Sequence, residues 1–245
     1  DRKSARLVNV SARAVILATG GSGQLCLQNF PTSNHVGATG DGLVLAYRQG
    51  CRLIFVDSYQ YHPSGACYPE ALAGQLVTEA VRSAGAQVVN SEGLHFINEL
   101  AYRDVLAGAI IKEIREGRGV TTPNGKQGIW LDTPMIDLKN GEGFLANQFP
   151  GLIHRFQRYQ IDPVKIPVLI YPTLHYQNGG ILIDSQCKTE LQGLWASGEV
   201  TGGVHGKNRL MGNSLLDILV FGRRAAESVK DEIPERGPLT LTNLK

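Results

Sequence analysis

The sequence predicts an α/β protein in which a mixed α+β insertion, residues 56–172, interrupts one larger α/β domain. Two observations lead to this prediction. Strand patterns occur near both ends of the chain, at residues 6–18 and 180–196, and both could belong to one domain. The middle of the chain has its own succession of strand and helix patterns, as expected for a second unit folded over the first. A cleft between two such domains is a common place for a small-ligand site.

The first strand and the turn after it are the clearest local signal. Residues 14–18 form a short continuous apolar run, which is typical of a strand buried on both faces of a sheet. The run ends in the glycine-rich stretch 19–23, where a tight turn can bring the backbone close to a ligand. Asp41, between two glycines, then stands at the N-terminus of a predicted helix over 43–48.

The remaining elements alternate along the chain. The predicted strands are 51–62, 129–131, 180–184 and 194–196, the predicted helices are 71–84 and 102–116, and residues 86–90 with 94–97 predict a hairpin. Ser214 opens a long predicted helix whose apolar residues cover most faces, so we expect it to be buried. Residues 231–245, with two prolines and a glycine, predict a linker.

Composition excludes several classes of function. Lys and Arg number 24 and Asp and Glu number 22, so the formal charge of +2 gives no reason to expect nucleic acid or an anionic membrane as partner. No apolar run approaches the ~20 residues that span a bilayer, so no direct membrane span is expected. The missing initiator Met and the absence of a signal peptide predict a piece of a longer protein or a processed product.

The four cysteines show no metal-binding spacing. They are Cys26, Cys51, Cys67 and Cys187, and none stands in a C-x-x-C pair. This argues against a structural zinc site, an iron–sulfur cluster built by this chain alone and a disulfide framework. We expect reduced thiols in a cytoplasmic protein, and no metal.

Several cationic and polar side chains stand in motif-like surroundings: His62, Thr78, Glu79, Arg82, Arg103, His175 and Arg209. Such donors could hold carboxylates by charge-assisted hydrogen bonds. Each also has a structural explanation, because a histidine before proline is often only a hydrogen-bonded structural residue, and Glu79 with Arg82 could be a helix-surface ion pair. Residue chemistry alone therefore predicts an α/β protein with a glycine-rich site and several cationic donors.

The ordered combination of motifs is far more specific than any one of them. In chain order they are Ala18-Thr19-Gly20-Gly21, Thr39-Gly40-Asp41-Gly42, His62-Pro63-Ser64-Gly65, Thr78-Glu79, Arg103-Asp104, His175-Tyr176, Gly179-Gly180, Gly198-Glu199, His205 to Leu210 and Asn213-Ser214-Leu215. Over about residues 12–230 the chain resembles the flavoprotein subunit of succinate dehydrogenase and fumarate reductase, a family that includes the L-aspartate oxidases.

The resemblance implies a partial Rossmann-type FAD-binding domain interrupted by a capping domain. Its implied divisions are 1–55 and 173–230 for the FAD-binding domain, 56–172 for the capping domain and 231–245 for a linker. The residues implied to contact FAD are Gly20, Gly21, Asp41, Tyr176, Glu199, Asn213, Ser214 and Leu215. The absence of a G-x-G-x-x-G loop leaves open whether this chain alone retains FAD.

The resemblance also implies the chemistry. His62, Thr78, His175 and Arg209 would bind a C4-dicarboxylate, and flavin N5 would deliver a hydride to fumarate while Arg103 donates a proton. Arg82 and Glu79 would relay the proton to Arg103, and His62 is counted with these catalytic residues. Succinate oxidation would be the reverse. Gln177 and Asn178 stand where relatives more often carry Thr-Met or Thr-Cys, a change beside the flavin that could alter its potential or the substrate fit.

Two other functions stay open at this point. An L-aspartate oxidase would use the same carboxylate-binding residues. Alternatively, the chain could be a non-catalytic fragment that needs a second polypeptide to supply the phosphate loop for FAD. The implied partners are the missing N-terminal half and an iron–sulfur subunit. The implied location is the cytoplasm or, through partner proteins, the inner face of the membrane.

Overall fold

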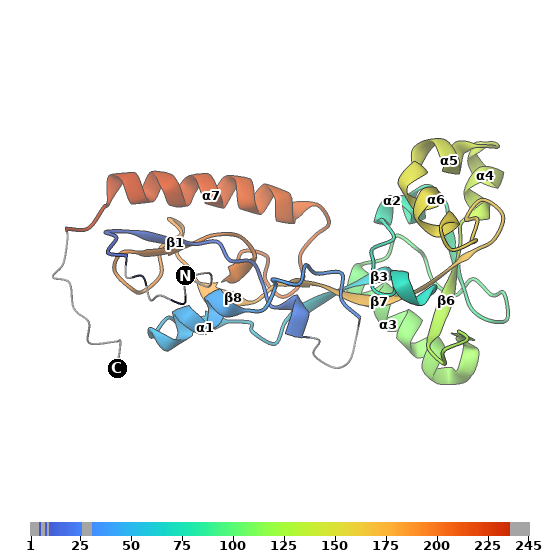
Figure 1. Cartoon of the computed structure of the whole chain (residues 1–245), viewed down its shortest axis with the longest axis horizontal. Helices are drawn as coiled ribbons and strands as arrows, with labels where there is room; N and C mark the ends of the chain where they lie inside the picture. Colours follow the sequence, from blue (N-terminus) through green and yellow to red (C-terminus); the bar gives the residue numbers. More distant parts are fainter. Residues whose placement is uncertain (1–4, 6–7, 9, 26–30, 236–245) are drawn as a thin grey trace. The chain divides into compact units, whose positions relative to one another are not determined.

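A computed structural model describes residues 5, 8, 10–25 and 31–235 (Figure 1). It contains two compact units. Unit 1 comprises residues 1–22, 40–58 and 177–245, and unit 2 comprises residues 23–39 and 59–176. Residues 23–39, counted above with the FAD-binding domain, are thus grouped with unit 2. The predicted domain boundaries themselves stay a prediction, and Cys26 and most of the predicted linker lie outside the described residues.

Unit 1 contains two small sheets. In the first, β1 (Val15–Leu17) pairs in parallel with β9 (Leu194–Ala196), so that residues far apart in the chain become neighbours, as Ile16 and Trp195 do. In the second, β8 (Gly180–Leu182) lies between β10 (Thr201–Gly202), which is parallel to it, and β2 (Leu53–Ile54), which is antiparallel. The helices of unit 1 are α1 (Asp41–Arg48), η5 (Gly198–Val200) and α7 (Asn213–Asp231).

A small core joins α1, β8, β9 and η5. It consists of Ala46, Cys51, Ile181, Ala196 and Val200, all buried. Because the core contains one residue from α1, one from β8 and one from β9, it fixes the turn after β1 and the loop after β9 in place. Those two loops carry Gly20, Gly21 and Glu199, three of the eight predicted cofactor contacts.

Unit 2 is built on a sheet with the strand order β3-β7-β6-β4, in which β5 also pairs with β6. The strands are β3 (Tyr59–Ala66), β4 (Gln87–Val89), β5 (Val120–Thr121), β6 (Gln127–Asp132) and β7 (Val168–Gln177). The helices are η1 (Gly23–Leu25), η3 (Glu70–Leu72), α2 (Glu79–Ser83), α3 (Arg103–Glu113), η4 (Ile114–Arg118), α4 (Pro134–Asn140), α5 (Phe144–Gln148) and α6 (Pro150–Gln157).

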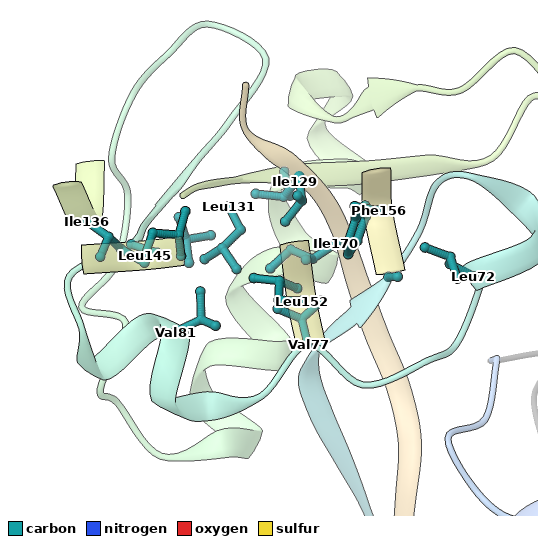
Figure 2. Packing of buried hydrophobic residues seen from close by; sticks show 14 of the residues in the cluster. Leu72, Val77, Val81, Ile129, Leu131, Ile136, Leu145, Leu152, Phe156 and Ile170 are labelled. Carbon is teal, nitrogen blue, oxygen red and sulfur yellow. The ribbon is translucent and has the colours of Figure 1, made fainter. Parts of the chain in front are cut away.

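The core of unit 2 is larger and continuous (Figure 2). Phe156 of α6 is fully buried and lies near Ile129 and Ile170 of the sheet, while Leu145 of α5 and Ile136 of α4 lie at the other end of the cluster. This core holds β3, α2 and α3 firmly, and these three elements carry the predicted catalytic residues.

Three local predictions are wrong in part. The helix predicted over 71–84 is two short helices, η3 and α2, because Gly74 has a φ of +83° and Leu76 forms a β-bridge with Gly65. The predicted hairpin is a single bridge from β4 to His95, since β4 pairs with β6 instead. The strand predicted over 51–62 is divided into β2 and β3 by a turn in which the Ser58 N–H donates to the Phe55 carbonyl at 2.8 Å.

The prediction that α7 is buried is also wrong. Its buried residues are Asp217, Ala225 and Ser228, and the last two pack against Trp195 of β9 in the same unit. The apolar positions on its other side are exposed: Leu215 66%, Leu216 60%, Ile218 50%, Leu219 69% and Val220 47%. In β1, expected to be covered on both faces, Val15 and Ile16 are 46% and 41% exposed. The apolar pattern of α7 thus marks a face that the other described residues of unit 1 leave exposed.

None of the helices in the described part of the chain has the length and apolar character that crossing a bilayer requires. The described residues also form no group of three or more side chains suited to hold a metal ion.

Candidate active site

In unit 2, Arg103 is held by side chains from two other elements. It is the first residue of α3, and its Nε and Nη2 donate to the same carboxylate oxygen of Glu79 at 3.1 and 2.8 Å. Its Nη1 donates to Gln60 Oε1, on β3, at 3.0 Å. These bonds use three of the five guanidinium N–H groups and orient its plane, so that one N–H on each terminal nitrogen remains available to a ligand.

Arg82 lies behind this pair. Its side chain is fully buried, and its Nη2 stands 3.5 Å from the Glu79 oxygen that Arg103 contacts. Burial lowers the pKa of Arg82, and the positive charge of Arg103 lowers it further, while Glu79 and Glu99 oppose the shift. Arg82, Glu79 and Arg103 therefore form a continuous chain of charged groups, which we call the arginine relay. Such a chain could pass a proton between its members.

Two histidines face each other across the strand pair β3–β7. The ring centroids of His62 and His175 are 5.3 Å apart, with the planes at 67°. The buried His62 accepts a hydrogen bond from the Ser64 N–H at its Nδ1, at 3.3 Å, which makes Nε2–H the donor of the neutral ring. Nδ1 of His175 lies 2.9 Å from Ser33 Oγ. Both rings are thus oriented by neighbours in unit 2.

Thr78 has a local structural role. It is the N-cap residue of α2, and its hydroxyl oxygen accepts a long hydrogen bond, 3.4 Å, from the Ala80 N–H. A hydroxyl that accepts from a helix N–H still has its own proton to donate. The cap therefore leaves a donor at Thr78, and its role in substrate binding stays a prediction.

In unit 1, the glycine turn after β1 lies against Glu199. Gly20 has a φ of +74°, and a Cβ built on Gly21 would stand 2.6 Å from Glu199 Oε1. The same oxygen accepts the Gln177 N–H at 2.8 Å. Burial raises the pKa of Glu199, which the hydrogen bond from Gln177 and the charge of Arg209 oppose. The structure thus places the Glu199 carboxyl group directly against the backbone of the glycine turn at Gly20 and Gly21.

The start of α1 lies next to the same glycine turn. Asp41 is exposed and is the first residue of α1, directly after Gly40, whose φ is +74°. The Gly40 N–H donates to the Gly21 carbonyl at 3.1 Å. A Cβ on Gly42 would stand 1.9 Å from Thr19 Oγ1, so a glycine is required there for this approach.

The remaining predicted cofactor contacts lie on α7 and β7. Asn213, Ser214 and Leu215 form the first turn of α7, and no side chain caps the N-terminus of this helix. An uncapped helix N-terminus presents N–H groups and a partial positive charge. Tyr176 is buried near the end of β7 and belongs to unit 2, whereas the other seven belong to unit 1.

Arg209 belongs to a different unit from the other predicted substrate ligands. It is buried in unit 1, and its Nη1 donates to the Leu210 carbonyl at 3.1 Å. His62, Thr78 and His175 all lie in unit 2.

Sequence reasoning missed two residues that orient this cluster. Gln60 accepts a hydrogen bond from Arg103, and a signal for it existed, because it precedes His62 by two residues on a strand and shares its face. Ser33 contacts His175 from a segment 142 residues away, and no local pattern indicated it.

The chain matches known proteins over nearly its whole length. The family described as FAD binding domain matches residues 1–215. The chain is 43% identical over 224 residues to a subunit of the fumarate reductase (CoM/CoB) of Methanothermobacter marburgensis, a match that covers 89% of the chain and 39% of that protein. It is 35% identical over 237 residues to L-aspartate oxidase 1 of Ralstonia nicotianae, where the match covers 94% and 42%.

A solved structure shows the same fold. The chain matches a quinol fumarate reductase of E. coli with a TM-score of 0.82 and 33% identity, over 93% of this chain and 40% of that one. The chain therefore spans about two fifths of the length of these relatives.

Proposed function

Because the chain belongs to the FAD-binding domain family, we propose that it is the substrate-binding part of an FAD-dependent oxidoreductase that interconverts fumarate and succinate. The observation that supports this most strongly is the arginine relay of unit 2, in which Gln60 and Glu79 orient the guanidinium of Arg103. A surface ion pair would not need two oriented acceptors from separate elements.

The residues of unit 1 fit an FAD. A Cβ on Gly20 would meet no described atom within 4 Å, so the turn is open there, while the Glu199 carboxyl group lies directly against Gly21. One carboxylate oxygen of Glu199 accepts a hydrogen bond from the Gln177 N–H. The other oxygen can accept a hydrogen bond from a hydroxyl of the cofactor. The first turn of α7 supplies N–H groups for the electron-rich edge of the ring system. Bound FAD would supply the hydride acceptor and donor that no side chain can provide.

His62 and His175 would bind one end of the substrate. Each ring is oriented by a neighbour, and the tautomer fixed at His62 makes its Nε2–H the group that would donate to a carboxylate oxygen. Arg209 of unit 1 would also bind a substrate carboxylate, since a guanidinium can bind a carboxylate through two parallel N–H groups.

Arg103 would donate the proton to the carbon that receives no hydride. A guanidinium is a weak acid with a pKa above ~12, so it needs a route for rapid reprotonation. Glu79 Oε2, 2.8 Å from Arg103 Nη2, and Arg82 behind it would provide that route.

The test is turnover of fumarate by the full-length protein with a reduced dye as electron donor. We expect Arg103→Ala to lower turnover at least ~100-fold, the size of a general-acid contribution, with unchanged flavin content. The matched control is Lys112→Ala, on the same helix with a side chain 71% exposed, which should retain activity. Unchanged turnover in Arg103→Ala would refute the proton-donor role.

The 35% identity to an L-aspartate oxidase supports that activity as a second candidate. The same carboxylate ligands would hold L-aspartate, so the two functions differ in the bond that is oxidised. Steady-state assays with fumarate, succinate and L-aspartate separate them. Turnover of L-aspartate alone would replace our first proposal with the second.

We also propose that the chain acts together with further polypeptide, including an iron–sulfur subunit of the full assembly. The support from the structure is the exposed apolar face of α7, defined by Leu215, Leu216, Ile218, Leu219 and Val220. If the 245-residue chain alone is a fragment that cannot hold the cofactor, it will be colourless after gel filtration. Retained yellow colour would contradict that alternative.

A further inference from the structure

Asn178 makes three hydrogen bonds inside unit 1 that connect two distant segments. It follows β7 directly and is 2% exposed. Its backbone N–H donates to the Ser58 carbonyl at 2.9 Å, and its side-chain Nδ2 donates to the Lys207 carbonyl at 2.9 Å. Its Oδ1 accepts the backbone N–H of Arg209 at 3.2 Å. Both side-chain bonds go to the main chain, on either side of Asn208.

The backbone that carries the Asn178 side chain is tightly packed. A Cβ on the next residue, Gly179, would stand 1.9 Å from the Phe55 carbonyl oxygen, so the backbone at 178–179 packs tightly against the turn at 55–58. The Lys207 ammonium also stands 5.4 Å from the centre of the Phe55 ring. The amide of Asn178 is thus a fixed group against which the loop that carries Arg209 is held.

The loop itself is rich in glycine. Residues 203–212 connect β10 to α7 and contain Gly203, Gly206 and Gly212, with φ values of +93°, +62° and +79°. His205 ties the loop to α7, with its Nε2 3.3 Å from Asp217 Oδ2, but this contact lies before residue 207. Glycines add conformational freedom to a loop, so the position of Arg209 depends on the contacts that fix residues 207–209.

We propose that Asn178 is a positioning residue, whose amide holds the main chain of Lys207 and Arg209 so that the Arg209 side chain is preorganised for the substrate carboxylate. This inference rests on the proposed function of Arg209. Only a planar amide of this length supplies a donor for one backbone group and an acceptor for the other. Asp keeps the acceptor but places a negative charge against the Lys207 carbonyl, and Leu of similar volume removes both bonds.

The experiment compares Asn178→Leu and Asn178→Asp with the wild type in the full-length flavoprotein. The control is Gln192→Leu, an exposed residue of unit 1 outside the proposed site. Hydrogen exchange of peptides covering 203–212 is measured without substrate, and KM and kcat for fumarate are measured separately. Flavin content and the melting temperature report whether each variant is folded.

We expect faster exchange at residues 207–209 in both Asn178 variants. The KM for fumarate should rise up to about tenfold, the upper range for ordering one long side chain on binding. The value of kcat should change less than about threefold, because the reacting groups of unit 2 are untouched. Asn178→Asp, which keeps the acceptor for the Arg209 N–H, should show the smaller change of the two.

Two results would overturn the inference. Unchanged exchange in a folded Asn178→Leu variant would show that the amide does not hold the loop. Faster exchange with an unchanged KM would show that the loop position does not govern substrate binding. Arg209→Met, measured alongside, tests the proposed function itself. If its KM is normal, Arg209 is not a substrate ligand, whereas the exchange data still report on Asn178.

Discussion

Gly21→Ala should displace the Glu199 carboxylate while leaving unit 1 folded. The new Cβ would stand 2.6 Å from Glu199 Oε1 and 2.8 Å from its carboxyl carbon, both well inside contact distance. These atoms are the far end of a flexible side chain, so Glu199 can rotate away. Doing so breaks the 2.8 Å hydrogen bond from the Gln177 N–H.

The size of the effect follows from that bond. A hydrogen bond to a charged group contributes about 1.5–3 kcal/mol, which corresponds to a change of roughly ten- to a hundredfold in an equilibrium constant. The Gln177 bond exists without the cofactor, so its loss should lower the free energy of unfolding by about this amount. Glu199 also loses the position from which it would accept a cofactor hydroxyl, a bond of the same class, so FAD affinity should fall by roughly ten- to a hundredfold.

The assay is titration of the deflavinated full-length protein with FAD, followed by flavin fluorescence. The matched control is Gly222→Ala, on α7 of the same unit, where the new Cβ would meet only Ser197 Oγ at an ordinary 3.8 Å. The control should bind FAD as the wild type does. Wild-type affinity in Gly21→Ala would refute the role given to the close contact between Gly21 and Glu199.

Two further predictions test unit 2 and unit 1 separately. Hydrogen bonds, chiefly from Arg118, hold the pKa of Glu113 at about 2, below its ordinary 4.5; a lowered acid pKa stabilises the fold above the unfolded pKa, and this is lost as the pH falls toward 2. The excess stability of the wild type over Glu113→Gln in urea unfolding should therefore be largest near neutral pH and shrink below about pH 4.5, and an excess independent of pH would contradict this. For unit 1, the isolated 245-residue chain should bind a hydrophobic dye at the exposed face of α7, and the double variant Leu215→Lys with Leu219→Lys should bind less. Equal dye binding by both chains would place the exposed apolar surface elsewhere.

Local signals were sufficient wherever an element depends on nearby residues. The strand β1, the glycine turn after it and the helix α1 were all predicted from one stretch, because a short apolar run and glycines restrict the backbone locally. The helix predicted over 102–116 was also found, as α3 with the turn of η4 after it. Family resemblance then added the cofactor, and the match to the FAD-binding domain family over 1–215 confirms it.

The sequence failed where long-range pairing competes with local preference. Residues 71–84 have a helical pattern, but the bridge between Gly65 and Leu76 takes part of the segment into extended structure. The same competition pairs β4 with β6 rather than with its neighbour in sequence. Such choices depend on the whole sheet of unit 2, which no window of sequence contains.

By itself, then, the sequence determined the fold class, the order of its motifs and the residue types that could bind a cofactor and two carboxylates. Only the tertiary structure decided which of them meet. Gln60, Glu79 and Arg103 come from three separate elements and converge because the core of unit 2 packs β3, α2 and α3 together. Packing likewise brings Asn178 to the main chain of Arg209, and it leaves one face of α7 exposed. Hydrogen-bond geometry and burial depend on distances between segments far apart in the chain, and those distances are set by packing.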